Sequence, residues 1–165
     1  MSIQITPKSA QLLLQAIEQD TQLAQSLKSI LQEEKKLLEQ RQYTAHGSLL
    51  SQKTQLLMDL DQADMKRRQL MAEMGLQLDK SGFDLFVKQV PSAWRDRFES
   101  SWERLADTMN TCARLNQING KILSHARNSM ERLMGIIKGT PNQAAVYLAN
   151  GRRNLSAPNR MLVTA

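Results

Sequence analysis

Several kinds of residue are scarce in this chain, and each shortage excludes a class of protein. The 165 residues include one cysteine, Cys112, which excludes a disulfide framework and a metal site built from several cysteines. Aromatic residues make up only 4% of the chain, with 7 glycines and 4 prolines, a poor match to a compact α/β enzyme. No apolar run approaches the roughly 18 residues that a membrane-spanning helix needs. The single cysteine also favours a reducing compartment. Glutamine is abundant instead, so the composition favours long, exposed helices.

Charge is distributed unevenly along the chain, whose net charge is +6. Residues 1–79 carry nine basic and ten acidic side chains, whereas residues 80–165 carry thirteen and six. A basic region can meet nucleic acid, an acidic protein or a membrane surface, or it can be solvated without such a partner. We expect no nucleic-acid partner, because Tyr147 is the only aromatic residue after Trp102 and no binding motif is recognisable.

The N-terminal segment predicts a location and a first helix. MSIQITPKSA lacks the basic and apolar parts of a signal peptide, so we expect a cytoplasmic protein without stable membrane insertion. Thr6 and Pro7 suit the N-cap and the first position of a helix. Apolar residues then recur at steps of three and four as far as Leu38. We expect a break near His46-Gly47, and a helix that runs straight through it is the alternative.

A second helical run and a turn follow. Residues 49–78 have nearly heptad spacing, which Lys53 and Arg67 interrupt. We expect DKSGF, 79–83, to form a turn. A short apolar patch comes next, and Pro91 ends it.

The third run, 93–137, is the longest and predicts a coiled-coil seam. Its apolar positions alternate at steps of three and four from Trp102 to Ile137. Asn116 and Asn119 occupy seam positions where apolar residues are expected. A buried asparagine in a seam sets register at a cost in stability, and a locally exposed polar stretch is the alternative. Gly120 would let another backbone approach closely.

The end of the chain predicts a separate segment. TPNQ, 140–143, is a helix start with a capping-box pattern, and AAVYLANG, 144–151, gives about two helical turns. We therefore divide the chain into a helical bundle domain, 1–139, and a short amphipathic helix with a flexible basic tail, 140–165. The predicted fold is all-α: an elongated antiparallel bundle or coiled coil of three long helices, then a short C-terminal helix and tail. That tail can fold on a partner or have no role.

Candidate catalytic and metal-binding groups are sparse. GIIKGT, 135–140, has too little of the phosphate-loop pattern. His46 and His125 lack companion ligands at metal-binding spacing, and Cys112 on the seam is more typical of a small buried side chain. We expect no enzymatic activity, no cofactor and no metal.

The order of motifs in 94–151 resembles the FlgN family of flagellar type III export chaperones. The resemblance rests on a long helix that carries LNQING, an apolar stretch to GIIKG, the short YLANG unit and a basic tail. It implies an all-helical cytoplasmic protein without catalysis. Such a chaperone would hold the helical C-terminal ends of hook–filament junction proteins, prevent their premature assembly and deliver them to the type III export gate and other export components.

The resemblance also places the contacts. It implies cargo binding in 115–163 and makes Tyr147 the candidate contact for the cytoplasmic domain of the export gate. Helix-in-groove recognition needs an apolar stripe, and methionines add adaptable surface. The candidate cargo-binding residues are Asn116, Ile118, Asn119, Ile122, Met130, Leu133, Met134 and Ile137. The same residues could instead pack on the protein's own first two helices.

A second function fits the heptad pattern alone. A generic coiled-coil adaptor or assembly protein would associate with itself through the seam, and its association would weaken when Leu105 or Met109 is made polar. The chaperone hypothesis predicts binding through apolar burial, little affected by salt and lost on removal of the C-terminal segment.

Overall fold

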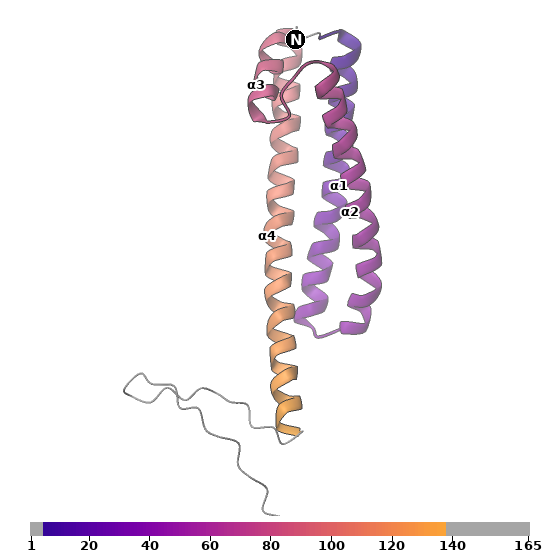
Figure 1. Ribbon diagram of the computed structural model, residues 1–165, viewed down its shortest axis with the longest axis vertical. Coiled ribbons are helices and arrows are strands. Elements are labelled where there is room, and N and C mark those ends of the chain that lie inside the picture. Colours follow the sequence, from indigo (N-terminus) through magenta and orange to yellow (C-terminus); the bar gives the residue numbers. More distant parts are fainter. Residues whose placement is uncertain (1–4, 138–165) are drawn as a thin grey trace, which may run out of the picture. The chain divides into compact units, whose positions relative to one another are not determined.

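The computed structural model describes residues 5–137, which form four helices and contain no strand (Figure 1). They are α1 (Pro7–Glu39), α2 (Tyr43–Glu73), α3 (Lys80–Gln89) and α4 (Ser92–Ile137). The chain divides into two compact units, Met1–Leu123 and Ser124–Ala165. The predicted all-α class with three long helices is confirmed. The helix expected at 140–151, the tail and the 139/140 boundary lie outside the described residues.

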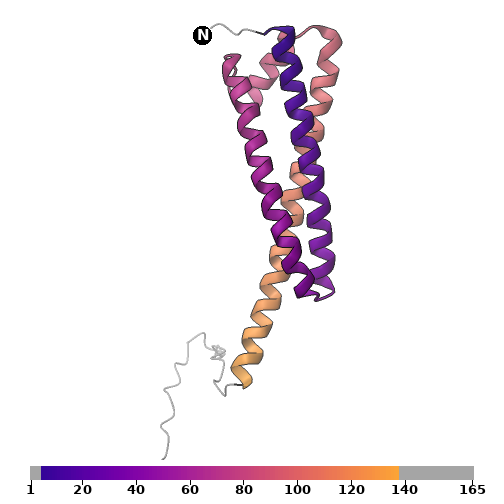
Figure 2. The ribbon, with the colours of Figure 1, turned by 90° about the vertical axis from the view of Figure 1, so that its right-hand side faces the viewer.

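The first unit is built on an antiparallel pair, α1 and α2, alongside which the first part of α4 runs (Figures 1 and 2). Thr6 caps α1 as predicted, since its side chain accepts from the Ser9 N–H at 3.1 Å and Ser9 reciprocates at the Thr6 N–H. This capping box satisfies two amides that a helix start leaves without partners. The short α3 lies at the end of the unit where α1 begins (Figure 1).

The first break comes earlier than expected, and α2 runs straight through His46-Gly47. Helix α1 ends with Arg41 in the left-handed conformation, φ 58°. The Arg41 and Gln42 N–H groups return to the carbonyls of Leu38 (3.1 Å) and Leu37 (2.9 Å), a Schellman motif. Glycine usually takes the left-handed position, so an arginine there hid the break from sequence reasoning.

The expected turn at 79–83 was wrong, because α3 already begins at Lys80. Asp79 is its N-cap and accepts from the Gly82 N–H at 2.9 Å, so the segment initiates a helix. The reversal lies before it, at Gly75 (φ 74°). There the Leu76 N–H returns to the Met71 carbonyl at 2.9 Å and closes α2.

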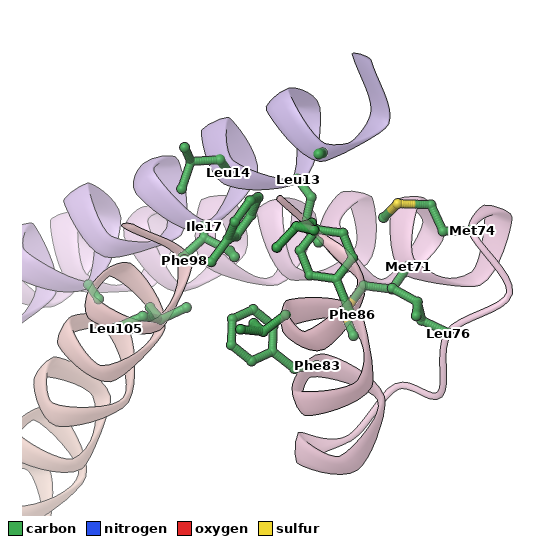
Figure 3. Close-up of a cluster of buried hydrophobic side chains, with 14 residues drawn as sticks. Leu13, Leu14, Ile17, Met71, Met74, Leu76, Phe83, Phe86, Phe98 and Leu105 are labelled. Carbon is green, nitrogen blue, oxygen red and sulfur yellow. The ribbon is translucent and has the colours of Figure 1, made fainter. Parts of the chain in front are cut away.

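The main core joins α1, the end of α2, α3 and the start of α4 (Figure 3). Phe86 and Phe98 are fully buried, and their rings meet edge to face with centroids 4.8 Å apart. Phe83 stacks on Trp102 at 4.3 Å. Much of the chain's small aromatic content is thus concentrated at this end, where the short α3 completes the packing.

The seam of α4 is buried at one position in each heptad. Phe98, Leu105, Cys112 and Asn119 are all buried and follow each other at intervals of seven residues. A smaller core cluster joins Cys112 to Leu27 and Leu31 of α1. Helix α4 continues through Gly120, where an added Cβ would meet nothing within 4 Å. The close backbone approach proposed for Gly120 is therefore absent from the described residues.

Two glycine substitutions test these local geometries. Gly120→Ala should raise the free energy of unfolding by about 0.5–1 kcal/mol, because alanine is the better helix former and the site has room. Gly82→Ala should lower it, because a Cβ there would collide with the backbone of Gln77. Urea unfolding followed by circular dichroism measures both. A stabilising Gly82→Ala, or a destabilising Gly120→Ala, would contradict the described packing.

Candidate partner-binding surfaces

A buried carboxylate, Glu34 on α1, joins three helices. Its oxygens accept hydrogen bonds from Lys53 Nζ (2.9 Å) on α2 and Asn119 Nδ2 (2.7 Å) on α4, and His46 Nε2 lies 3.2 Å away. Lys53 also donates to Asn116 Oδ1 at 2.9 Å. A carboxylate with this many partners remains charged in the folded protein although it is buried.

The pKa of Glu34 reflects the competition between burial and these contacts. Burial alone would raise that pKa, but hydrogen bonds from Asn119 and Lys53, the charge of Lys53 and the contact with His46 together hold the pKa below its ordinary value. A lowered pKa means that folding favours the ionised carboxylate. Its contribution to stability is therefore present above the unfolded pKa and is lost as the pH falls through the folded pKa.

The two seam asparagines have different surroundings. Asn119 is buried, 3% exposed, and its amide nitrogen donates both to Glu34 and to the Leu31 carbonyl at 2.9 Å. Asn116 is exposed and meets Lys53. The buried asparagine is the arrangement expected of a residue that fixes helix register. Sequence reasoning identified both asparagine positions but did not identify Glu34, His46 and Lys53 as members of this network. The only sequence signal for the network was a lysine, Lys53, within an apolar run.

A second charged cluster lies further along the same helices. Arg67 of α2 donates from Nε to Asp20 of α1 at 2.6 Å, pairs with Asp64, and lies 5.3 Å from the ring of Trp102. Asp20 is buried. Burial raises its pKa, and the hydrogen bond and charge of Arg67 oppose that rise. Both charges that interrupt the second apolar run thus form ion pairs with α1.

The last turns of α4 present apolar side chains to solvent. Met130, Leu133, Met134, Ile136 and Ile137 are between 43% and 78% exposed. Four of them are candidate cargo-binding residues, spaced as i, i+3, i+4 and i+7 from Met130, so they share one helix face. A gathering of large apolar side chains in solvent marks an interaction surface.

Two further candidates are less open. Ile118 and Ile122 are partly buried within the first unit. Tyr147 lies outside the described residues. Cys112 is buried, and its thiol meets the Ala24 carbonyl at 3.4 Å; burial raises the pKa of this thiol, so it behaves as a small core side chain. Within 5–137, no helix is long and apolar enough to cross a membrane.

Comparison with known proteins decides the family. The FlgN protein family model matches residues 1–154. The chain belongs to the FlgN family. A solved structure with a similar fold is that of a protein assigned as the flagella synthesis protein FlgN of Pseudomonas aeruginosa, with a TM-score of 0.63 and 24% identity, over 74% of this chain and 91% of that one. No curated protein sequence matches the chain.

Membership of the FlgN family confirms the resemblance drawn from LNQING and YLANG, and it gives the chain the role of a flagellar export chaperone. FlgN is a family of chaperones and not of enzymes. Its partners are accordingly flagellar proteins and the export apparatus.

The Glu34 network predicts an acid-sensitive part of stability. Glu34→Gln should lower the free energy of unfolding at neutral pH by about 1–3 kcal/mol, because it removes a buried, charge-assisted set of hydrogen bonds. The difference from the unchanged protein should shrink as the pH falls below the ordinary glutamate value of 4.5. Urea titrations between neutral and acid pH measure it.

Glu39→Gln is the matched control, because Glu39 is on the same helix, pairs with Lys35 and has a side chain that is 52% exposed. Exposed pairs of this kind contribute little, so its unfolding curves should follow those of the unchanged protein. A Glu34→Gln difference that stays constant with pH would show that Glu34 is not the titrating group.

Proposed function

We propose that this FlgN-family chaperone binds the helical C-terminal ends of hook–filament junction proteins in the cytoplasm and delivers them to the type III export gate. Those ends are apolar and form helices, so they would assemble prematurely unless they were covered. A chaperone covers them by offering its own apolar helix face until export. The proposal needs an open apolar stripe on this chain that is not used by the chain's own core.

The observation that carries the proposal is the exposed stripe of Met130, Leu133, Met134 and Ile137 on α4. Each of these side chains is at least 43% exposed. Their spacing is that of anchors in helix-in-groove recognition. The described residues of Ser124–Ala165 bury none of these four side chains. A partner helix could therefore bury all four together.

The chemistry of the stripe suits more than one cargo. Two of its four side chains are methionines, which are unbranched and adapt to different surfaces, and adaptable surfaces allow promiscuous binding. Burial of apolar area provides the affinity, so binding should change little with salt. Polar side chains flank the stripe: Arg127 pairs with Glu131 at 2.8 Å, and Arg132 contacts Ser129.

The remaining candidate residues have supporting roles in this proposal. Asn116 and the partly buried Ile118 and Ile122 belong to the first unit and are proposed cargo contacts of that unit. Asn119, which is held by Glu34 and Leu31, would act by fixing the register of α4. The alternative function is an adaptor that associates with itself through the seam. Of the two seam residues on which it was argued, Leu105 is buried in the protein's own core and Met109 is 41% exposed.

Polar substitutions on the stripe test the cargo contact. Met134→Glu combined with Ile137→Glu should weaken binding to C-terminal segments of hook–filament junction proteins by more than about tenfold, because charges cannot be buried without a partner. Isothermal titration calorimetry at low and high salt measures the affinity. We expect similar affinities for the unchanged protein at both salt concentrations.

Met58→Glu with Met65→Glu is the control pair, because both methionines are exposed on α2 (61% and 64%). It adds the same charge and should leave cargo binding unchanged. Equal affinities for both double variants would remove the stripe as the cargo site. If the unchanged protein does not bind these segments, the proposed cargo is wrong.

Tyr147 is the proposed contact for the export gate. Tyr147→Ala should reduce binding of the full chain to the cytoplasmic domain of the gate and leave its affinity for cargo unchanged, because the two contacts involve different residues. Surface plasmon resonance with the immobilised gate domain measures the first quantity, and calorimetry measures the second. Loss of both together, or of neither, would contradict a separate gate contact at Tyr147.

A further inference from the structure

An apolar groove runs between α2 and α4 within residues 5–123. It consists of two adjacent hollows with volumes of about 400 and 210 Å³. Both are lined by Leu27 of α1, Leu57 of α2 and Met109 of α4, so α1 forms the floor and the other two helices form the walls. The groove belongs to the first unit, and none of the exposed stripe residues on the last turns of α4 lines it.

The wall on α4 is the second row of the seam. One row of that seam, from Phe98 to Asn119, is buried in the protein's own core. The other row supplies Trp102, Met109 and Asn116, again seven residues apart, and all three line the groove. Met109 is 41% exposed. In a coiled coil both rows pack into a partner helix. This row is only partly covered, because Trp102 stacks on Phe83 and Asn116 accepts from Lys53, whereas Met109 between them stays open.

The dimensions of the groove suit one helix. Trp102 and Asn116 are separated by about 21 Å along α4, at about 1.5 Å per residue, which is about four turns. Small side chains, Ala106 and Ala113, line it on α4 beside Met109 and let a helix axis come close. The opposite wall offers Leu57, 46% exposed. A helix between the two walls would complete a four-helix arrangement.

One end of the groove is acidic. Asp20, Asp61 and Asp64 line it there. Arg67 is shared by Asp20 and Asp64, and Arg68 also reaches Asp64. This leaves Asp61 exposed to solvent, and it has no ion pair among the described residues. A free carboxylate beside an apolar surface favours a partner that brings a cation.

We propose that this groove binds an amphipathic helix of another protein, about four turns long, whose apolar stripe packs against Leu57 and Met109 and whose lysine or arginine lies beside Asp61. This surface is additional to the cargo stripe and does not depend on it. The chaperone would then have two places for partner helices. Basic amphipathic character in the partner distinguishes this surface from the stripe, where apolar burial alone provides the affinity.

A pair of designed peptides tests the proposal on the full chain. Each is a helix of about 18 residues with leucines at i, i+3, i+4 and i+7, and the two differ only in flanking lysines or flanking glutamates. Trp94→Phe leaves Trp102, which lines the groove, as the only tryptophan. We expect the lysine peptide to bind, to shift the Trp102 emission to shorter wavelength, and to bind at least about tenfold more tightly than the glutamate peptide.

Substitutions locate the binding. Leu57→Glu should weaken the lysine peptide by at least about tenfold, whereas Met58→Glu, on the next residue and more exposed, should change it by less than about twofold. Asp61→Asn should reduce the preference for lysine over glutamate. Leu57→Glu should leave affinity for the junction-protein segments unchanged, so this proposal and the cargo proposal fail independently.

Three results would overturn the proposal. The first is no binding of the lysine peptide by the full chain. The second is an equal loss in Leu57→Glu and Met58→Glu, which would place the peptide elsewhere. The third is self-association of the unchanged protein in sedimentation experiments that Leu57→Glu abolishes, which would make a second copy the occupant of the groove.

Discussion

The carboxylate of Glu34 is the interaction on which the alignment of the three long helices depends. Apolar packing at the far end of the unit, around Phe86 and Phe98, determines that α1, α3 and α4 meet, but apolar contacts tolerate sliding. The Glu34 oxygens do not, because they must meet Lys53 of α2 and Asn119 of α4 within hydrogen-bonding distance. A shift of either helix by one turn would leave a buried charge without partners, at a cost of several kcal/mol.

The two ends of the first unit are thus stabilised in different ways. The end near α3 contains most of the large buried side chains and the stacked rings. The other end has small clusters of leucines and Cys112, supplemented by the Glu34 network. Apolar burial provides most of the free energy, and the polar contacts select one register among those that the leucine-rich repeats would allow.

Periodicity in the sequence predicted the long helices because heptad spacing directly reflects which side chains face a neighbour. Thr6 and Pro7 located the start of α1. The repeat through 93–137 left open whether that helix is continuous at Gly120, and the structure shows that it is. The breaks were harder to predict. Arg41 adopts a left-handed conformation that its residue type does not signal, and Asp79, a favoured N-cap residue, starts a helix where a turn was expected. Partners such as Glu34 and Lys53 could not be paired in advance, because they lie 19 residues apart on different helices. Likewise, the spacing indicated an apolar stripe at Met130–Ile137 but could not show which seam residues the core would use.

The division of the α4 seam into a buried row and an open row has a consequence for how sequences in this family should diverge. Residues in the row of Phe98, Leu105, Cys112 and Asn119 are buried within their own chain, so substitutions there must be matched by changes in α1 or α3. Residues in the row of Trp102, Met109 and Asn116 line the groove. They must therefore suit the helix that fills it as well as their own neighbours, Phe83 at Trp102 and Lys53 at Asn116. Substitutions along α4 should therefore fall into two sets, each with a seven-residue period. One set should vary together with the helices of the same chain, and the other should vary together with the partner.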